Sequence, residues 1–306
     1  MSHFLSRPMT NPVHRIKFPA YLGIRNAKSL IQKCNEAFSS SANTILFDLW
    51  ICRFSDPFAI TLLAGSMRVC VSRGRKVFYK KPRKKVLDQH FNRIGFYKFG
   101  KSVVGKSKYA PHQVELQHLT ALRPDYTAAV IQVLKGYLNL SRGVQDSLYL
   151  SVNELMTNTF DHSKTVVGCF GCAQAWTERG TVGICLTDFG RGILASLLTV
   201  TKYSHLKNSV EAIELAILKG VSSRTNILAG LGLDHIHRFL RVNKGQIHII
   251  SGDGWVHWNY GNGENVIITR KKLKVAFEGT IVNILARADG EGIYILESET
   301  REDQIF

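Results

Sequence analysis

Four short polar or glycine-containing motifs follow one another between residues 151 and 283, and their order constrains the fold more than any other feature of the chain. The first lies in a predicted helix over residues 144–160, where Glu154 and Asn158 stand four positions apart. Side chains at this spacing project from one face of a helix. A carboxylate beside an amide oxygen can orient a nucleophile and help to complete an octahedral Mg²⁺ shell. Alone, the pair is weak evidence for a functional site, because Glu and Asn at this spacing are also common on the solvent-exposed surfaces of helices.

The second motif begins with a predicted strand over residues 182–186 that runs into Asp188, followed by Gly190, Gly192 and Ile193. A carboxylate at a strand end can accept a proton from an adenine amino group. The two glycines let a ligand approach the backbone closely, although a simple tight turn would use them in the same way.

The third motif is a polar segment from residue 219 to residue 226, followed by Gly230-Leu231-Gly232-Leu233 at the start of a predicted helix. Backbone N–H groups at such a helix N-terminus suit phosphate oxygens, but the segment could equally be an ordinary glycine-rich loop. The fourth motif, Gly279-Thr280, enters a predicted strand over residues 280–285 and alone predicts only that strand.

Together and in this order, the motifs resemble the N, G1, G2 and terminal Gly-Thr boxes of the GHKL (Bergerat) superfamily. That superfamily includes the gyrase B subunit, MutL, histidine-kinase catalytic domains and anti-sigma-factor serine kinases. The resemblance covers residues 126–286, and a predicted strand over residues 245–251 also fits the family pattern. It implies a two-layer α/β sandwich that binds Mg·ATP.

The resemblance also implies roles for individual residues. Glu154 would position or activate the attacking water or hydroxyl, Asn158 would hold Mg²⁺, and Asp188 would bind the adenine amino group. Gly190, Gly192 and Ile193 would shape the base pocket, and Thr280 would join its water network.

Residues 220–232 would form a lid over the nucleotide. Gly230 and Gly232 would lie against the phosphates, with Leu231 and Leu233 beside them. The further lid contacts would be Ser222, Ser223 and Arg224.

The first half of the chain alternates predicted strands and helices, which indicates a small α/β unit. Phe47-Asp48-Leu49 and the segment Arg53-Phe54-Ser55-Asp56-Pro57-Phe58 resemble the strand, turn and helix of STAS domains, the anti-sigma-factor-antagonist fold. Members of that family usually carry a phosphorylatable serine after the Asp, but Pro57 follows Asp56 here, which favours an interaction module over a phosphorylated switch. We therefore expect a STAS-like domain over residues 1–110 and a GHKL domain over residues 111–306, with residues 100–125 as a linker.

Charge is distributed unevenly in this chain, whose formal net charge is +17. Basic side chains crowd residues 73–108, where Asp88 is the only acid. Such a stretch can bind nucleic acid phosphates or an acidic protein partner, or it can be a solvated surface. The candidate contacts are Lys80, Lys81, Arg83, Lys84 and Lys85, with Phe78, Tyr79 and Phe91 interleaved among them.

Six cysteines sit mostly in apolar segments, and the Cys169–Cys172 spacing has no second pair at a zinc-site interval. We interpret them as reduced, buried thiols. Since the sequence has no apolar run of ~20 residues and no signal-like N-terminus, we expect a soluble, cytoplasmic protein that does not enter a membrane.

Three functional hypotheses follow from these patterns. The leading one is an ATPase or ATP-gated switch that acts on a protein partner through the STAS-like domain. The second is a serine protein kinase of the anti-sigma-factor type, in which a partner's hydroxyl replaces water. The third is a nucleic-acid-binding protein regulated by ATP. A homodimer that forms through residues 126–140 is compatible with each of them.

Overall fold

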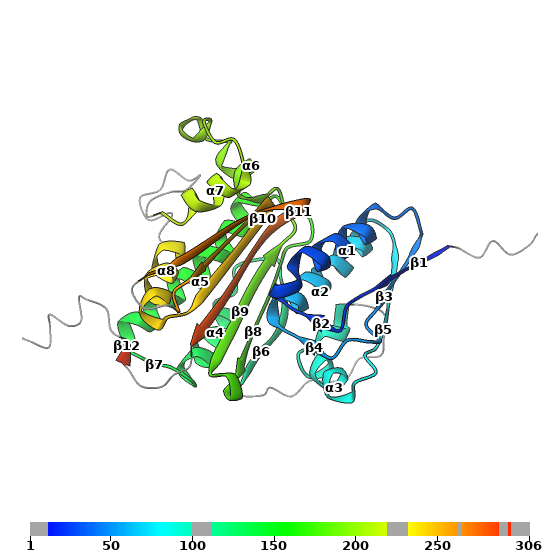
Figure 1. The fold of residues 1–306 in the computed structure, drawn as a ribbon, viewed down its shortest axis with the longest axis horizontal. Coiled ribbons are helices and arrows are strands. Elements are labelled where there is room, and N and C mark those ends of the chain that lie inside the picture. The colour runs from blue at the N-terminus through cyan, green and yellow to red at the C-terminus, as the bar shows by residue number, and fades with distance from the viewer. Residues whose placement is uncertain (1–11, 100–111, 219–231, 262–264, 288–292, 295–306) are drawn as a thin grey trace, which may run out of the picture.

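The N-terminal part of the chain folds around a small parallel sheet. The computed structural model describes residues 12–99, 112–218, 232–261, 265–287 and 293–294, which form a mixed α/β fold (Figure 1). The sheet has the order β1-β3-β5, with parallel pairing throughout. The strands and their connecting helices are β1 (Val13–Lys17), α1 (Ala27–Ser39), β3 (Thr44–Asp48), α2 (Pro57–Ser72) and β5 (Lys76–Lys80). This is the β-α-β-α-β arrangement that the sequence predicts.

Short elements complete this part. The parallel pair β2 (Tyr21–Leu22) and β4 (Phe54–Ser55) precedes α2, and α3 (Lys85–Arg93) and the 3-10 helix Phe96–Phe99 follow β5. Asp56 fixes the start of α2, because its Oδ1 accepts a hydrogen bond from the Ala59 N–H at 3.0 Å. Its Oδ2 accepts another from the Ile24 N–H at 2.9 Å. Asp56 is therefore a structural cap.

The larger sheet has five strands in the order β10-β11-β9-β8-β6, all paired antiparallel. The strands are β6 (Gln113–Leu119), β8 (Cys169–Trp176), β9 (Thr181–Asp188), β10 (Gln246–Asn259) and β11 (Ile267–Arg287). The expectation that residues 100–125 form a linker is wrong for residues 113–119. β6 buries Val114, Leu116 and Leu119, so it belongs to the core of the sandwich.

Strand β10 turns back on itself at Gly252-Asp253. The Tyr260 N–H donates to the Gly245 carbonyl at 3.0 Å, and the rings of His248 and His257 stack with centroids 3.9 Å apart. The first half of β10 pairs with residues 280–285 of β11, and the second half pairs with residues 267–272. The hairpin therefore widens the sheet beyond the short strand predicted over residues 245–251.

Helices cover the two faces of the large sheet separately (Figure 1). On one face lie α4 (Pro124–Lys135), α5 (Arg142–His162) and α8 (Gly232–Asn243), packed on side chains that include Ile184, Ile249 and Val282. On the other face lie α1 and α2. Two short helices, α6 (Gly192–Leu197) and α7 (Ser209–Ala216), follow β9, and a small parallel pair joins β7 (Asn139–Leu140) to β12 (Ile293–Tyr294).

The face covered by α1 and α2 forms one hydrophobic core with the N-terminal part. This core includes Phe58 and Leu62 from α2 together with Phe170, Phe189 and Phe277 from the large sheet and the residue after β9. The Thr61 and Thr187 hydroxyls lie 2.8 Å apart, both fully buried. The two sheets are thus joined by apolar contacts and by a buried hydrogen bond.

All six cysteines are free and buried, as the sequence predicts. Burial raises the pKa of the Cys34, Cys52 and Cys185 thiols to about 12, which keeps these thiols protonated and unreactive. Among the helices that the structure describes, none is long and apolar enough to cross a membrane.

Candidate functional site

The candidate site is built on a row of side chains on the face of the large sheet that α4, α5 and α8 cover. Strand pairing sets Ser251 opposite Thr280, Thr280 opposite Asp188, and Asp188 opposite Cys169. Since side chains alternate between the faces of a strand, Asp188 shares the face of Ile184 and Leu186, which pack in the core beneath α4, α5 and α8. The motifs that contain Asp188 and Thr280 lie far apart in sequence but meet here, side by side.

Asp188 is a buried carboxylate at the end of β9. Only 5% of the residue is exposed. Its Oδ1 accepts a hydrogen bond from the Gly190 N–H at 2.9 Å. Desolvation raises the pKa of this carboxyl to about 7, although the backbone N–H groups of Gly190 and Thr280 act in the opposite direction. A polar ligand group that donates to this carboxylate would replace part of the lost hydration.

Ser251 joins the site, and the sequence motifs do not include it. Its Oγ accepts a hydrogen bond from the Ile193 N–H at 2.8 Å, donates to the Gly279 carbonyl at 3.1 Å and lies 3.2 Å from the Thr280 Oγ1. The sequence does contain a signal for it: Ser251 stands two positions after Ile249 and four after Ile247, so a strand would place all three side chains on the same face. Ser251 thus ties the start of α6 to two strands.

Two glycines of the second motif are required by close packing. A Cβ atom at Gly190 would lie 2.1 Å from the Ser163 carbonyl oxygen. Gly192 has φ of +79°, a left-handed conformation, and a Cβ there would lie 2.8 Å from the Ser251 Oγ. The loop after Asp188 is therefore pressed both against the end of α5 and against β10.

Helix α5 carries Glu154 and Asn158, both half-buried. The C-terminal end of α5 is fastened to the second motif, because the Arg191 N–H donates to the Ser163 carbonyl at 2.7 Å. Thr159, the residue after Asn158, is buried, and its side chain contacts Cys169. Cys169 is the residue that pairs with Asp188 across the two strands. The motif on α5 and the motif after β9 are thus parts of one structural unit.

The third motif is described only in part. Gly232 and Leu233 begin α8, which packs on α5, and Leu233 is half-buried against the core of the helix layer. The other candidate contacts of this motif lie outside the described residues: Ser222, Ser223, Arg224, Gly230 and Leu231.

A magnesium site at Asn158 would use few protein ligands. Among the described residues, no group of three His, Cys, Asp or Glu side chains is arranged to hold a metal ion. One amide oxygen on a half-buried helix surface suits Mg²⁺ only where phosphate oxygens and water supply the other ligands, which is how proteins commonly hold this ion.

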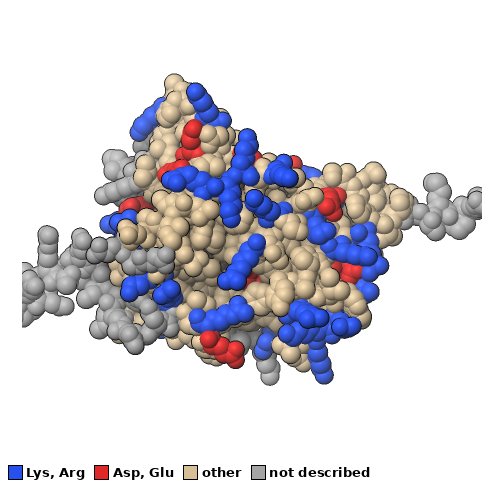
Figure 2. Space-filling view, viewed as in Figure 1, with Lys and Arg blue, Asp and Glu red and all other residues tan. Residues whose placement is uncertain are grey.

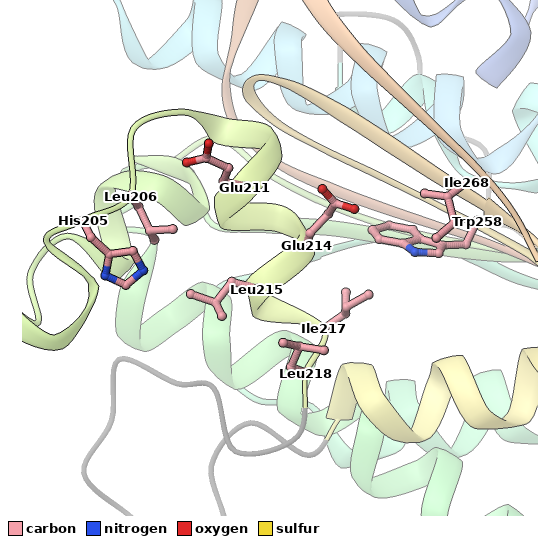
Figure 3. A pocket seen from close by; sticks show the side chains of 9 residues that line it. All are labelled: His205, Leu206, Glu211, Glu214, Leu215, Ile217, Leu218, Trp258 and Ile268. Carbon is pink, nitrogen blue, oxygen red and sulfur yellow. The ribbon is translucent and has the colours of Figure 1, made fainter.

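A pocket of about 530 Å³ lies apart from the Asp188 row, beside α7 (Figure 3). Leu206, Leu215 and Trp258 line it, and Glu214 at its margin forms an ion pair with Arg270. Its connection with the candidate site is indirect: Ser209, the first residue of α7, donates to Asp253 in the turn of β10 at 2.6 Å. The pocket contains none of the candidate site residues.

No family model matches the chain, and no curated protein matches it. Among solved structures, it is similar to the topoisomerase IV ATP-binding domain of Francisella tularensis, which was solved in complex with a small-molecule inhibitor. The identity is 14% and the TM-score 0.26, and the match covers 63% of this chain and 48% of the other. The chain spans about half the length of that structure, and a likeness at this score assigns neither family nor activity.

Proposed function

We propose that the chain binds Mg·ATP between α5, the start of α6 and the row formed by Ser251, Thr280 and Asp188. The observation that carries the proposal is the buried Asp188 carboxylate, which receives backbone hydrogen bonds and forms no ion pair among the described residues. Burying a carboxylate is costly, and an adenine amino group would supply the missing donor.

The groups around Asp188 suit a purine. Gly190 and Gly192 let the loop after Asp188 pack closely against α5 and β10, and the half-buried Ile193 at its end would offer the base an apolar surface. Thr280 and Ser251 add two hydroxyls that can hold a water beside the Asp188 carboxylate. We assign the base pocket to these residues, and the phosphates to the segment that precedes α8.

We infer that hydrolysis is the reaction. Glu154 would accept a proton from the water that attacks the γ-phosphorus, while the bond to the bridging oxygen breaks and ADP leaves. Asn158, one turn further along α5, would hold the metal. Mg²⁺, when bound, would neutralise phosphate charge in the transition state.

The N-terminal part would then sense the nucleotide through α2. Thr61 contacts Thr187, and Gly65 contacts Phe189, so the two residues that flank Asp188 are held from the opposite face. Because α2 is buried there, we propose that a protein partner uses the outer surface of the N-terminal part.

Turnover of γ-labelled ATP with Mg²⁺ tests the reaction. We expect Glu154→Ala to lower kcat by about 100-fold or more while nucleotide binding remains. Glu178→Ala, at an exposed glutamate outside α5 and the Asp188 row, is the matched control and should keep wild-type turnover. Hydrolysis that survives in Glu154→Ala would refute the assigned base. Transfer of label to serine in a partner protein, in place of release as phosphate, would assign a kinase instead.

A further inference from the structure

We propose that the carboxyl end of the sheet β1-β3-β5 binds single-stranded nucleic acid, with a base stacked on Trp50 and phosphates held by the surrounding Lys and Arg side chains. This inference does not depend on the proposed ATP site. It concerns the opposite part of the molecule and can be tested without nucleotide.

The topology collects the surface at one edge. The last residues of the three parallel strands are in register, with Lys17 beside Asp48 and Asp48 beside Lys80. In open sheets of parallel strands, ligands bind outside the carboxyl ends, where the connecting loops supply side chains. The loop after β3 carries Trp50, and the segment after β5 carries the basic residues of the proposed surface.

Trp50 is the central aromatic residue of this edge. It is 43% exposed, and the Lys80 Nζ lies over its ring at 4.4 Å from the centroid. The neighbouring pair β2-β4 sets Tyr21, which is 61% exposed, opposite Phe54, and the Arg179 guanidinium lies over the Phe54 ring at 4.9 Å. Aromatic rings combined with cations form the usual stacking platforms for unpaired bases.

Positive charge surrounds these rings. The Arg83 N–H donates to the Trp50 carbonyl at 2.9 Å, which fixes the basic segment after β5 against the loop that holds Trp50. Figure 2 shows Lys and Arg side chains gathered where Figure 1 places α3. The exposed members of this segment are Lys81, Arg83, Lys84 and Lys85.

The acids of β3 and α3, Asp48 and Asp88, are already paired. Asp48 is buried and forms an ion pair with Arg15, and its Oδ1 accepts the Trp50 N–H at 3.0 Å. Asp88 accepts from the Tyr97 hydroxyl and lies 3.8 Å from the Lys81 Nζ. The charge that the surface presents to a partner is therefore strongly positive, which complements a polyanion.

The structure corrects the aromatic set expected from the sequence. Phe91 is fully buried in the core, and the half-buried Tyr79 stacks on Tyr97 with centroids 4.7 Å apart, so neither ring is free to stack on a base. Phe78 is 40% exposed and lies on β5. Trp50 replaces Phe91 and Tyr79 in the proposed surface. The parallel pairing of β3 with β5 brings the loop after β3, which holds Trp50, beside the basic segment after β5.

Single strands fit this surface better than duplexes. A duplex already stacks its bases internally and offers no free base to Trp50, whereas a single strand presents both bases and phosphates.

Fluorescence anisotropy of labelled dT12, rU12 and a duplex of equal length, measured over a salt series, tests the proposal. We expect at least one single strand to bind more tightly than the duplex, and Trp50→Ala to weaken that binding roughly 5- to 100-fold. The triple variant Lys81→Glu, Lys84→Glu, Lys85→Glu should bind still more weakly and lower the slope of log K against log salt by about 2. Comparison of dT12 with rU12 shows which sugar is preferred.

The control variant carries Lys28→Glu, Lys135→Glu and Lys274→Glu, an equal charge change at exposed residues on α1, α4 and β11. It should retain most of the single-strand affinity, and circular dichroism should show that all variants are folded. Equal losses in both triple variants, or wild-type affinity in Trp50→Ala, would overturn the proposal. So would binding to vesicles rich in phosphatidylserine without binding to any oligonucleotide.

Discussion

Gly192 and Gly74 share a backbone conformation but differ in surroundings. Their φ angles are +79° and +78°, yet a Cβ at Gly192 would meet the Ser251 Oγ at 2.8 Å, whereas nothing lies within 4 Å of a Cβ at Gly74. We expect Gly74→Ala to cost about 1 kcal/mol of unfolding free energy through backbone strain alone. Gly192→Ala should cost about 2–3 kcal/mol and should also weaken nucleotide binding, because it displaces Ser251.

Chemical denaturation and nucleotide titration of the two variants measure both effects. Equal affinity for ATP in the Gly192→Ala variant and the wild type would show that the Ser251 contact does not shape the site.

Asp188 should make stability depend on pH. Its folded pKa of about 7 exceeds the ordinary value of 3.8, so the fold prefers the neutral carboxyl. Stability from this group is fully present below pH ~4 and is lost as pH rises to about 7, by at most about 4 kcal/mol. Asp188→Asn keeps an oxygen for the Gly190 N–H without this penalty.

Unfolding free energies of both proteins between pH 5 and pH 8 provide the measurement. We expect the unfolding free energy of the variant to rise relative to that of the wild type as pH rises. The contribution of Asp56, whose pKa is raised to about 6 by burial, is the same in both proteins and cancels in the comparison. A difference that is constant with pH would mean that Asp188 is ionised at pH 5.

At the scale of elements, α2 forms the support behind the second motif. A Cβ at Gly65 would lie 2.0 Å from the Phe189 ring, next to Asp188. We expect Gly65→Ala to cost about 1–3 kcal/mol by overpacking and to lower nucleotide affinity as Phe189 moves. Ser66→Ala removes a buried hydroxyl that donates to the Leu62 carbonyl and should affect stability alone.

Thermal unfolding and calorimetric titration separate these outcomes. If Gly65→Ala and Ser66→Ala change nucleotide affinity equally, α2 has no specific link to the site.

The sequence predicted elements well where apolar spacing is regular. The alternation of strands and helices in the first half, helix α5 and strand β9 agree with expectation, because each of these elements buries a clear stripe or run of apolar residues. Strand β6 was missed because polar residues interrupt its apolar ones within a segment bounded by Pro111 and Pro124. The length of the hairpin formed by β10 and β11 was underestimated. Arg270, Lys271 and Lys272 lie in the first part of β11 and interrupt the apolar alternation that would predict a strand. The second and fourth motifs meet in the structure, as the sequence led us to expect, but Ser251 and the contact with α2 depend on sheet pairing, which local sequence does not show.

At the scale of the whole molecule, the two halves of the chain should unfold together. Their shared core joins Phe58 and Leu62 to Phe170, Phe189 and Phe277. Because separation would expose this apolar surface, we expect one cooperative transition in guanidinium. Fluorescence of a variant that retains only Trp50 reports the N-terminal part, and one that retains only Trp258 reports the large sheet. Distinct midpoints for the two probes would mean that the halves fold independently.

The central claim is that a single adenine nucleotide is bound by the second motif together with α5. Isothermal titration of the purified chain with a non-hydrolysable ATP analogue and Mg²⁺ tests it most directly, with Asp188→Ala measured in parallel. The account predicts saturable binding of one nucleotide per chain, weakened at least about 10-fold in the variant. Absence of binding to the folded wild type, or equal affinity in Asp188→Ala, would contradict it.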